Sequence, residues 1–276
     1  MRFAIKTSPQ ETTFDAMREV WQAADELPVF ESAWNFDHFY PIFSDSSGPC
    51  MEGWTTLTAL AALTKRIRIG CLVTGAVYRH PAVLANMAAT LDIVSEGRLE
   101  LGIGAGWNEE ECAAYGIELG TLKERFDRFD EVLVILDSLL RNEWTDFEGE
   151  HFTLTRARNE PKGPQRPRPP ITIGGSGPKR TLKAAARWAD HWNHPGGSPE
   201  QIAAAKDVLH RHCADLGRDP AEILTSTHVR YDAAAGPQAL VDTCGSLEGI
   251  VDMAIVYVPP PHDAATVAVI AEAITA

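Results

Sequence analysis

Segments with the pattern of β-strands alternate with segments of helical periodicity along the whole chain. Eight short apolar runs are each followed by a stretch in which apolar residues recur every three to four positions. This alternation is typical of parallel sheets whose strands are joined by helices. Eight repeats favour a (β/α)8 barrel, and a doubly wound open sheet is the alternative. The predicted strands are residues 3–6, 29–36, 67–73, 99–103, 171–173, 189–193, 226–231 and 252–258.

The alternation is interrupted once, after the fourth predicted strand and the helices that follow it. Residues 143–170 are irregular and contain only a predicted hairpin around residues 147–152 and a proline-rich stretch. Domain boundaries usually fall in flexible linkers, and no linker divides this chain. We therefore expect residues 1–276 to form a single barrel domain with an insertion near its middle.

The fourth predicted strand ends in a cluster of glycines, Gly102, Gly104 and Gly106, followed by Trp107 and Asn108. This is not a dinucleotide-binding fingerprint, which has the spacing G-x-G-x-x-G near the N-terminus. The pattern instead predicts a buried strand that breaks into a loop and enters a helix, with Asn108 as the helix N-cap. Ligands bind at such loops in barrels. A tight turn without a ligand is the alternative.

Polar residues also follow other strands at the expected ligand-binding end. Asp37 and His38 come directly after the second strand. An imidazole transfers protons near neutral pH and a carboxylate can orient it, although both residues could equally satisfy local turns. The loop Gly174-Gly-Ser-Gly177 precedes a helix predicted from Pro178, and its backbone amides suit a phosphate. A plain glycine-rich turn is the alternative there.

The composition argues against several classes of function. A formal net charge of -13 disfavours nucleic acid as a partner, because phosphate binding needs clustered lysines and arginines. The five cysteines are scattered, which indicates reduced thiols and a cytoplasmic location rather than disulfides. No apolar run predicts a membrane helix, and the N-terminus lacks the pattern of a signal peptide. His191 and His194 form a lone His-x-x-His pair, so we expect no metal.

Seven segments together resemble the bacterial luciferase-like flavin and deazaflavin oxidoreductases, most of all the actinobacterial branch that uses coenzyme F420. The joint pattern spans most of the chain in order and is far more specific than any one piece. The segments are Phe36-Asp-His-Phe39, Arg66-Ile-Arg-Ile-Gly70, Tyr78-Arg-His-Pro81, Ala89-Thr-Leu-Asp92, Ser95-Glu-Gly-Arg-Leu99, Leu101-Gly-Ile-Gly-Ala-Gly-Trp-Asn-Glu109 and Ile171-Thr-Ile-Gly-Gly175.

The resemblance implies a (β/α)8 barrel with an insertion near the middle and a cofactor site at one end. Asp37 would lie near the polar edge of the deazaflavin, and His38 near its reactive face as proton donor or acceptor. In relatives the end of the third strand forms a bulge with a non-proline cis peptide that supports the ring. The implied cofactor-binding residues are Asp37, Leu72, Val73, Thr74, Ala105, Gly106, Asn108, Gly174, Gly175, Ser176 and Gly177, the last four around the phosphate.

Two departures from the relatives that oxidise glucose 6-phosphate argue against a sugar-phosphate substrate. Those relatives carry a glutamate near the position of Trp107 and a tryptophan after the Asp-His motif, where this chain has Tyr40-Pro-Ile42. Tyr78, Trp107 and Trp192 instead predict an apolar substrate pocket.

The resulting hypothesis is an oxidoreductase that transfers a hydride between F420 and a small organic substrate, with His38 and Asp37 as catalytic residues. The second hypothesis is an FMN-dependent monooxygenase that uses oxygen, because both cofactors share this scaffold. The third is a barrel that binds a small molecule, or nothing, without catalysis. Because relatives are often dimers, we also expect a homodimer.

Overall fold

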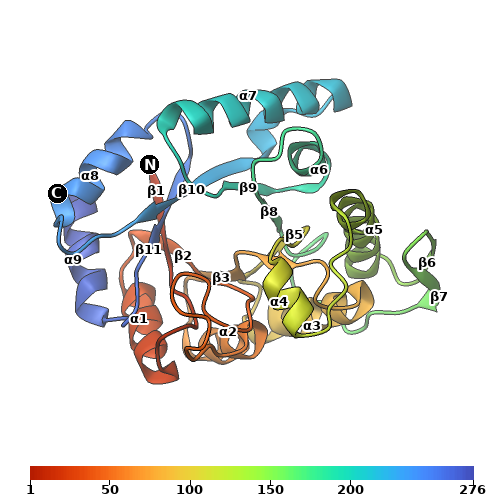
Figure 1. Cartoon of the computed structure of the whole chain (residues 1–276), viewed down its shortest axis with the longest axis horizontal. Helices are drawn as coiled ribbons and strands as arrows, with labels where there is room; N and C mark the ends of the chain where they lie inside the picture. The colour runs from red at the N-terminus through yellow and green to blue at the C-terminus, as the bar shows by residue number, and fades with distance from the viewer.

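The chain folds into a closed cylinder of parallel strands surrounded by helices (Figure 1). The computed structural model describes all residues from 1 to 276. The barrel strands are β1 (Arg2–Lys6), β2 (Phe30–Asn35), β3 (Arg68–Cys71), β4 (Thr74–Gly75), β5 (Leu99–Gly104), β8 (Ile171–Gly174), β9 (His191–His194), β10 (Leu224–Arg230) and β11 (Met253–Tyr257). They are hydrogen-bonded in the order β3-β2-β1-β11-β10-β9-β8-β5-β4, and a pairing of β3 with β5 closes the cylinder. The predicted (β/α)8 barrel is confirmed, and the doubly wound sheet is excluded.

The helices cover the outside of the barrel, where the main apolar core lies between them and the strands. They are α1 (Phe14–Glu26), α2 (Gly53–Leu63), α3 (Pro81–Val94), α4 (Glu109–Ala114), α5 (Leu122–Arg141), α6 (Thr181–Trp188), α7 (Pro199–Leu216), α8 (Pro237–Ser246) and α9 (Ala264–Thr275). The predicted cap is present, because the side-chain oxygen of Asn108 accepts the amide of Glu111 at the start of α4. The helix predicted to start near Pro178 is α6, which begins three residues later, because residues 178–180 form a turn.

The third predicted strand is divided into β3 and β4 by Leu72 and Val73. The peptide bond between these two residues is cis, as the family resemblance implies. The division explains one of the glycines in the motif after residue 98. A Cβ atom at Gly102 would lie 1.8 Å from the carbonyl oxygen of Cys71, at the end of β3. Only glycine therefore lets β5 approach the chain at this point.

The predicted hairpin in the insertion is present and lies outside the barrel (Figure 1). Its strands are β6 (Thr145–Glu148) and β7 (Thr153–Ala157), which pair antiparallel. The segment that returns from the hairpin is fixed by Arg168, whose guanidinium binds Asp137 on α5 and Asp190 before β9. The insertion is thus anchored to the outside of the cylinder and leaves the strand order intact.

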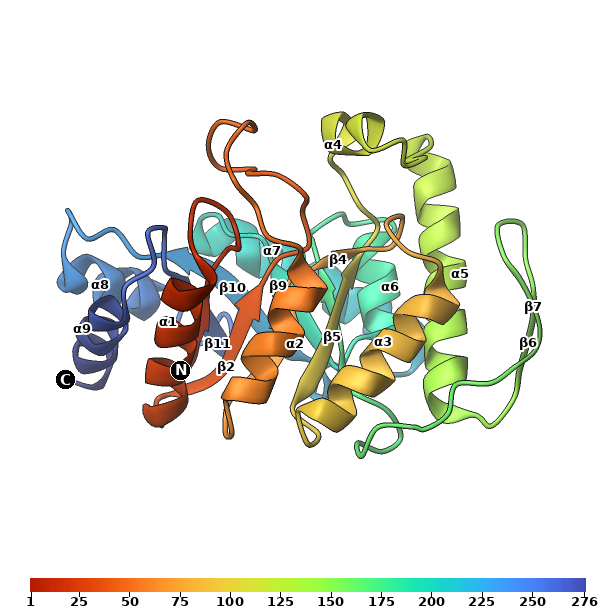
Figure 2. The same cartoon turned by 90° about the horizontal axis from the view of Figure 1, so that it is seen from below.

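Figure 2 shows the carboxyl ends of the strands on one side of the molecule, with two segments above them. One is the loop of residues 36–52 that follows β2, and the other is α4. The two segments touch, since the rings of Phe39 and Tyr115 lie 4.8 Å apart. No helix of the structure combines the length and the apolar character that a membrane crossing requires.

Candidate functional site

A cavity of about 440 Å³ opens at the carboxyl ends of the strands. Its wall comes from six of the barrel strands, from loops that follow the strands, and from one residue each of α5 and α6. The lining residues are Lys6, Phe36, His38, Ile42, Phe43, Leu72, Val73, Gly75, Tyr78, Gly104, Ala105, Gly106, Trp107, Phe126, Gly174, Gly175, Thr181, Asn193, Pro195 and His228. Such a concave, largely apolar space with a few converging polar groups is typical of a small-molecule site.

Backbone forms much of the wall of this cavity. Several of the residues that line the cavity are glycines, and side chains at these positions would occupy part of it. A Cβ atom at Gly75 would lie 2.7 Å from the ring of Tyr78, and one at Gly104 would lie 2.9 Å from Val73. Gly175 has a φ of 117°, which side-chain-bearing residues rarely adopt. A wall of this kind fits the flat face of a tricyclic ring, which packs closely against backbone.

His38 is the polar group of the cavity that is best oriented for proton transfer. Its Nδ1 lies 2.7 Å from Oε2 of Glu111 on α4. The same carboxylate accepts a hydrogen bond from the hydroxyl of Tyr78 (2.6 Å) and one from the backbone amide of Phe39 (2.6 Å). These contacts make Nδ1 the proton donor to Glu111 and leave the other ring nitrogen, Nε2, for a ligand.

The hydrogen bonds also fix the charge of Glu111. Burial by itself raises the pKa of this carboxyl, but the bonds from His38, Tyr78 and the amide of Phe39 outweigh it and lower the pKa below its ordinary value. For the hydroxyl of Tyr78, burial and the neighbouring negative charge both raise the pKa. Glu111 therefore stays an anion and Tyr78 stays protonated across the physiological range.

Two further nitrogen-bearing side chains, Lys6 on β1 and His228 on β10, line the cavity. The Nζ atom of Lys6 donates a hydrogen bond to the carbonyl oxygen of Leu72 at 2.9 Å. Burial lowers the pKa of this amine to about 8. Burial, together with the charge of Lys6, lowers the pKa of His228 well below its usual value, so the imidazole is neutral. Lys6 is the only lysine or arginine among the lining residues.

Asp37 lies behind the cavity and not in its wall. The side chain is fully buried, and both carboxylate oxygens bind the guanidinium of Arg79, which also binds Glu52 at 2.6 Å. Because Arg79 binds both oxygens of this carboxylate, Asp37 is not free to bind the polar edge of a cofactor. It ties the start of the loop after β2 to the loop before α3, and so supports the neighbouring His38.

The other expected cofactor residues divide into two groups. Leu72, Val73, Ala105, Gly106, Gly174 and Gly175 line the cavity. Thr74 is buried and accepts a hydrogen bond from Trp54 at 2.7 Å, and Asn108 is occupied as the cap of α4. Ser176 lines a separate hollow of about 480 Å³ between α6 and α7, and Gly177 lines neither space. The amide of Gly175 already binds the carbonyl of Asn193, which removes one donor from the expected phosphate loop.

The three aromatic residues expected in the substrate pocket have different positions. Tyr78 and Trp107 line the cavity, and Trp107 is 59% exposed at its mouth. Trp192 is a correction to the prediction. It is fully buried, and its indole nitrogen donates to the carbonyl of Gly175 at 2.8 Å. Neighbouring residues of a strand face opposite sides, so Asn193 points into the cavity and Trp192 points out towards the helices.

The His191-Trp-Asn-His194 segment holds no metal-like cluster. His191 faces the barrel interior, where it binds Glu100 at 3.1 Å and Ser226 at 2.7 Å. His194 lies at the hollow beside Ser176. Nowhere in the structure do three His, Cys, Asp or Glu side chains meet in an arrangement that could hold a metal ion.

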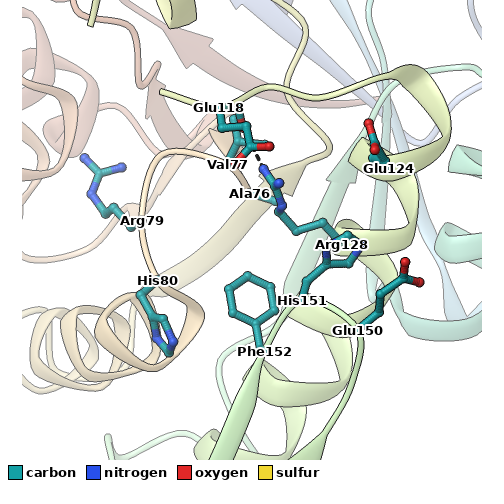
Figure 3. Close-up of a pocket in the computed structure, with 10 residues that line it drawn as sticks. All are labelled: Ala76, Val77, Arg79, His80, Glu118, Glu124, Arg128, Glu150, His151 and Phe152. Atoms are coloured by element: carbon teal, nitrogen blue, oxygen red, sulfur yellow. Dashed lines mark hydrogen bonds between the residues drawn. The ribbon is translucent and has the colours of Figure 1, made fainter. Parts of the chain in front are cut away.

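A second hollow, of about 590 Å³, lies on the outside of the barrel between the loop before α3 and the insertion hairpin (Figure 3). His80 and Phe152 face each other across it, with ring centroids 5.3 Å apart. Its two arginines are already engaged. Arg128 donates to the carbonyl of Glu118 at 2.6 Å, and Arg79 is directed to Asp37. We therefore place the functional site in the cavity at the carboxyl ends of the strands.

Sequence reasoning missed Glu111, Lys6 and His228. Glu111 falls in the helix predicted after Asn108, and Lys6 ends the first predicted strand, but neither position by itself indicates a role in the site. No local signal pairs Glu111 with His38, because 73 residues separate them. Side chains alternate between the two faces of a strand, so His228 could have been identified only if the inward-facing positions of β10 had been known.

The comparisons with known proteins agree with this geometry. Residues 1–269 match the profile of the luciferase-like monooxygenase family. The chain belongs to this family. It is 34% identical over 190 residues to the F420-dependent hydroxymycolic acid dehydrogenase of Mycobacterium tuberculosis, a match that covers 68% of this chain and 48% of that protein. It is 31% identical over 237 residues to the F420-dependent glucose-6-phosphate dehydrogenase of Microbacterium testaceum, covering 84% of this chain and 68% of that protein. The chain thus spans about half the length of the first of these relatives.

Solved structures share the luciferase-like fold at low sequence identity. An F420-dependent secondary alcohol dehydrogenase in complex with an F420-acetone adduct superimposes with a TM-score of 0.87 at 19% identity, over 99% of this chain and 98% of that one. A monooxygenase from Streptomyces bottropensis superimposes with a TM-score of 0.83 at 21% identity, over 100% and 99%. At these identities the likeness establishes the fold and leaves the cofactor open.

Proposed function

We propose that this luciferase-like protein is an F420-dependent oxidoreductase that transfers a hydride between the deazaflavin and an uncharged small alcohol or ketone. The observation that carries the proposal is the position of His38, with one ring nitrogen fixed by Glu111 and the ring in the wall of the cavity. The sequence relatives named above are F420-dependent dehydrogenases, which favours this cofactor.

Different residues of the chain would hold the cofactor and transfer the proton. The glycine-lined wall and the Leu72–Val73 segment would hold the ring, and the bound deazaflavin would supply or accept the hydride. When an alcohol loses a hydride, its hydroxyl proton must also leave. Nε2 of His38 would take that proton, and the Glu111 carboxylate stabilises the resulting imidazolium. In the reverse direction the same imidazolium returns the proton to the carbonyl oxygen.

The charge of the cavity favours an uncharged substrate. A sugar phosphate needs cationic side chains, and the lining contains a single lysine and no arginine. Phe43 and Trp107 are exposed at the mouth, at 57% and 59%, and present apolar surface next to His38. We therefore infer that the substrate carries its reacting carbon next to an apolar group. This differs from the substrate in the name of the Microbacterium relative.

Cofactor titrations test the proposal. F420 and FMN are added separately to the purified protein and binding is followed by absorbance and fluorescence. We expect saturable F420 binding and turnover with secondary alcohols, and no turnover with glucose 6-phosphate. Tight FMN binding without F420 binding would favour the monooxygenase hypothesis instead. His38→Ala decides between an enzyme and a binding barrel, because the variant should bind F420 normally and lose turnover by about 10²–10⁴-fold.

We also propose that the protein forms a homodimer through α2 and α3. Leu63 on α2 and Val83, Ile93 and Val94 on α3 are each at least 40% exposed, which gives these neighbouring helices an apolar outer surface. Light scattering at micromolar concentration should give twice the mass of 30.2 kDa.

All five cysteines are unpaired, which is compatible with the predicted cytoplasmic location.

A further inference from the structure

Lys6 is a buried positive charge without a protein counter-charge. It is 6% exposed, ends β1 and lines the cavity. Of its three ammonium hydrogens, one is donated to the carbonyl of Leu72, and no other acceptor in the chain binds this group. No carboxylate forms an ion pair with it. An unpaired buried ammonium ion is unfavourable in a free protein, because burial removes its hydration.

The groups packed around Lys6 do not offset its charge. Tyr257 lies beside it on β11, and Cys71 approaches from β3. Burial raises the pKa of both the Tyr257 hydroxyl and the Cys71 thiol, so each is neutral. His228 on β10 is a neutral imidazole, and β2 places Trp34 alongside. The chain therefore holds one positive charge at the cavity and surrounds it with neutral groups.

We propose that Lys6 is a cofactor-binding residue whose ammonium group receives the carbonyl-bearing edge of the deazaflavin ring. The inference rests on the proposed function and assigns the polar edge to a cation on β1, since Asp37 is occupied by Arg79. Two free hydrogens on Nζ and the absence of any carboxylate suit an electron-rich carbonyl or anionic nitrogen as partner. The third hydrogen, on the Leu72 carbonyl, fixes the amine beside the segment that supports the ring.

Proton uptake at Lys6 is a direct consequence. Burial lowers the pKa of the free amine to about 8, so at pH 9 most of it is uncharged. A ligand acceptor against the ammonium group favours the charged form and raises that pKa. Binding of F420 at pH 9 should therefore take up a proton. At pH 7, where Lys6 is already charged, this uptake should be small.

The test measures binding rather than turnover. Dissociation constants for F420 are determined by fluorescence at pH 7 and pH 9 for the wild type, Lys6→Met and Lys6→Arg. We expect wild-type affinity to fall by about tenfold more than that of Lys6→Met over this range, because a tenfold change corresponds to one unit of pKa. Lys6→Met should bind about tenfold more weakly than the wild type at pH 7. Lys6→Arg keeps its charge and should bind with little dependence on pH.

Calorimetry of the wild type in two buffers with different ionisation enthalpies gives the proton count without any variant. Uptake of a proton at pH 9 supports the inference even if Lys6→Met fails to fold. Equal affinities and equal pH profiles for the wild type and Lys6→Met, or no proton uptake at pH 9, would overturn it and leave the proposed function intact. Failure of the wild type to bind F420 at all would overturn both.

Discussion

The imidazole of His38 and the carboxylate of Glu111 lie 2.7 Å apart, although they come from different barrel loops. His38 follows β2, and Glu111 belongs to the first turn of α4 after β5. Tyr78, from the segment between β4 and α3, binds the same carboxylate. Three loops of the barrel are thus joined at one carboxylate, and this arrangement fixes the orientation of the His38 imidazole in the cavity wall.

Replacing Glu111 by glutamine should lower kcat by about 10–100-fold, because the amide cannot stabilise an imidazolium at His38. The affinity for F420 should change less than twofold, since Glu111 does not line the cavity. Glu110→Gln on the same helix is exposed and serves as the matched control. Equal loss of activity in the two variants would show that charge on α4, rather than the bond to His38, matters.

The same carboxyl predicts a pH dependence of stability. Its pKa in the folded protein is lowered, so its contribution is present above the unfolded value near 4.5 and is lost as the pH falls through the lower folded value. Urea titrations at pH 7 and at pH 3.5 should therefore show that Glu111→Gln destabilises the protein more at pH 7. A constant difference at both pH values would contradict the pairing.

Lys6 should make the wild type more stable in mild alkali. The pKa of Lys6 is about 8 in the folded protein and 10.5 ordinarily, so between these values the unfolded chain binds more protons and stability rises with pH. The full effect is about 3 kcal/mol, at 1.36 kcal/mol per unit of pKa. Denaturation at pH 7 and pH 10 should show this rise in the wild type and not in Lys6→Met. Parallel curves for the two proteins would contradict it.

Gly102→Ala should destabilise the barrel by at least about 2 kcal/mol, because the added Cβ would overlap the Cys71 carbonyl and backbone must move. Gly245→Ala on α8 is the control, since no atom lies within 4 Å of its added Cβ. That substitution should be neutral or stabilising by up to about 1 kcal/mol. Chemical denaturation compares the two. Similar stabilities would show that β5 does not depend on this close approach.

The two tryptophans should respond in opposite ways to substitution. Trp107→Ala should leave the unfolding free energy within about 0.5 kcal/mol, because the residue is exposed, and raise KM for apolar alcohols. Trp192→Phe leaves the carbonyl of Gly175 without its donor in the core and should cost about 1–3 kcal/mol. Thermal denaturation and kinetics on an alcohol series separate them. An unchanged KM in Trp107→Ala would remove this residue from the substrate site.

Much of the barrel follows from the order of apolar runs, because buried parallel strands read as short continuous hydrophobic segments. His38 and Gly175 could be placed at the site from the sequence, because each follows the carboxyl end of a predicted strand. The prediction failed where two alternatives differ by one residue, as for Trp192, whose four-residue strand β9 does not reveal its inward face. It was silent on Glu111 and Lys6, since their partners are set by closure of the cylinder.

The bond between His38 and Glu111 has one more consequence for how substrates arrive. It links the loop of residues 36–52 to α4, and both segments lie over the mouth of the cavity. The two segments therefore cannot separate while the imidazole keeps its alignment. If the loop and α4 moved apart to admit a bulky molecule, His38 would lose its bond to Glu111. The imidazole would then not be aligned for proton transfer until the two segments came together again. The hydrogen bond between His38 and Glu111 therefore couples closure of the cavity mouth to the alignment of the imidazole that transfers the proton.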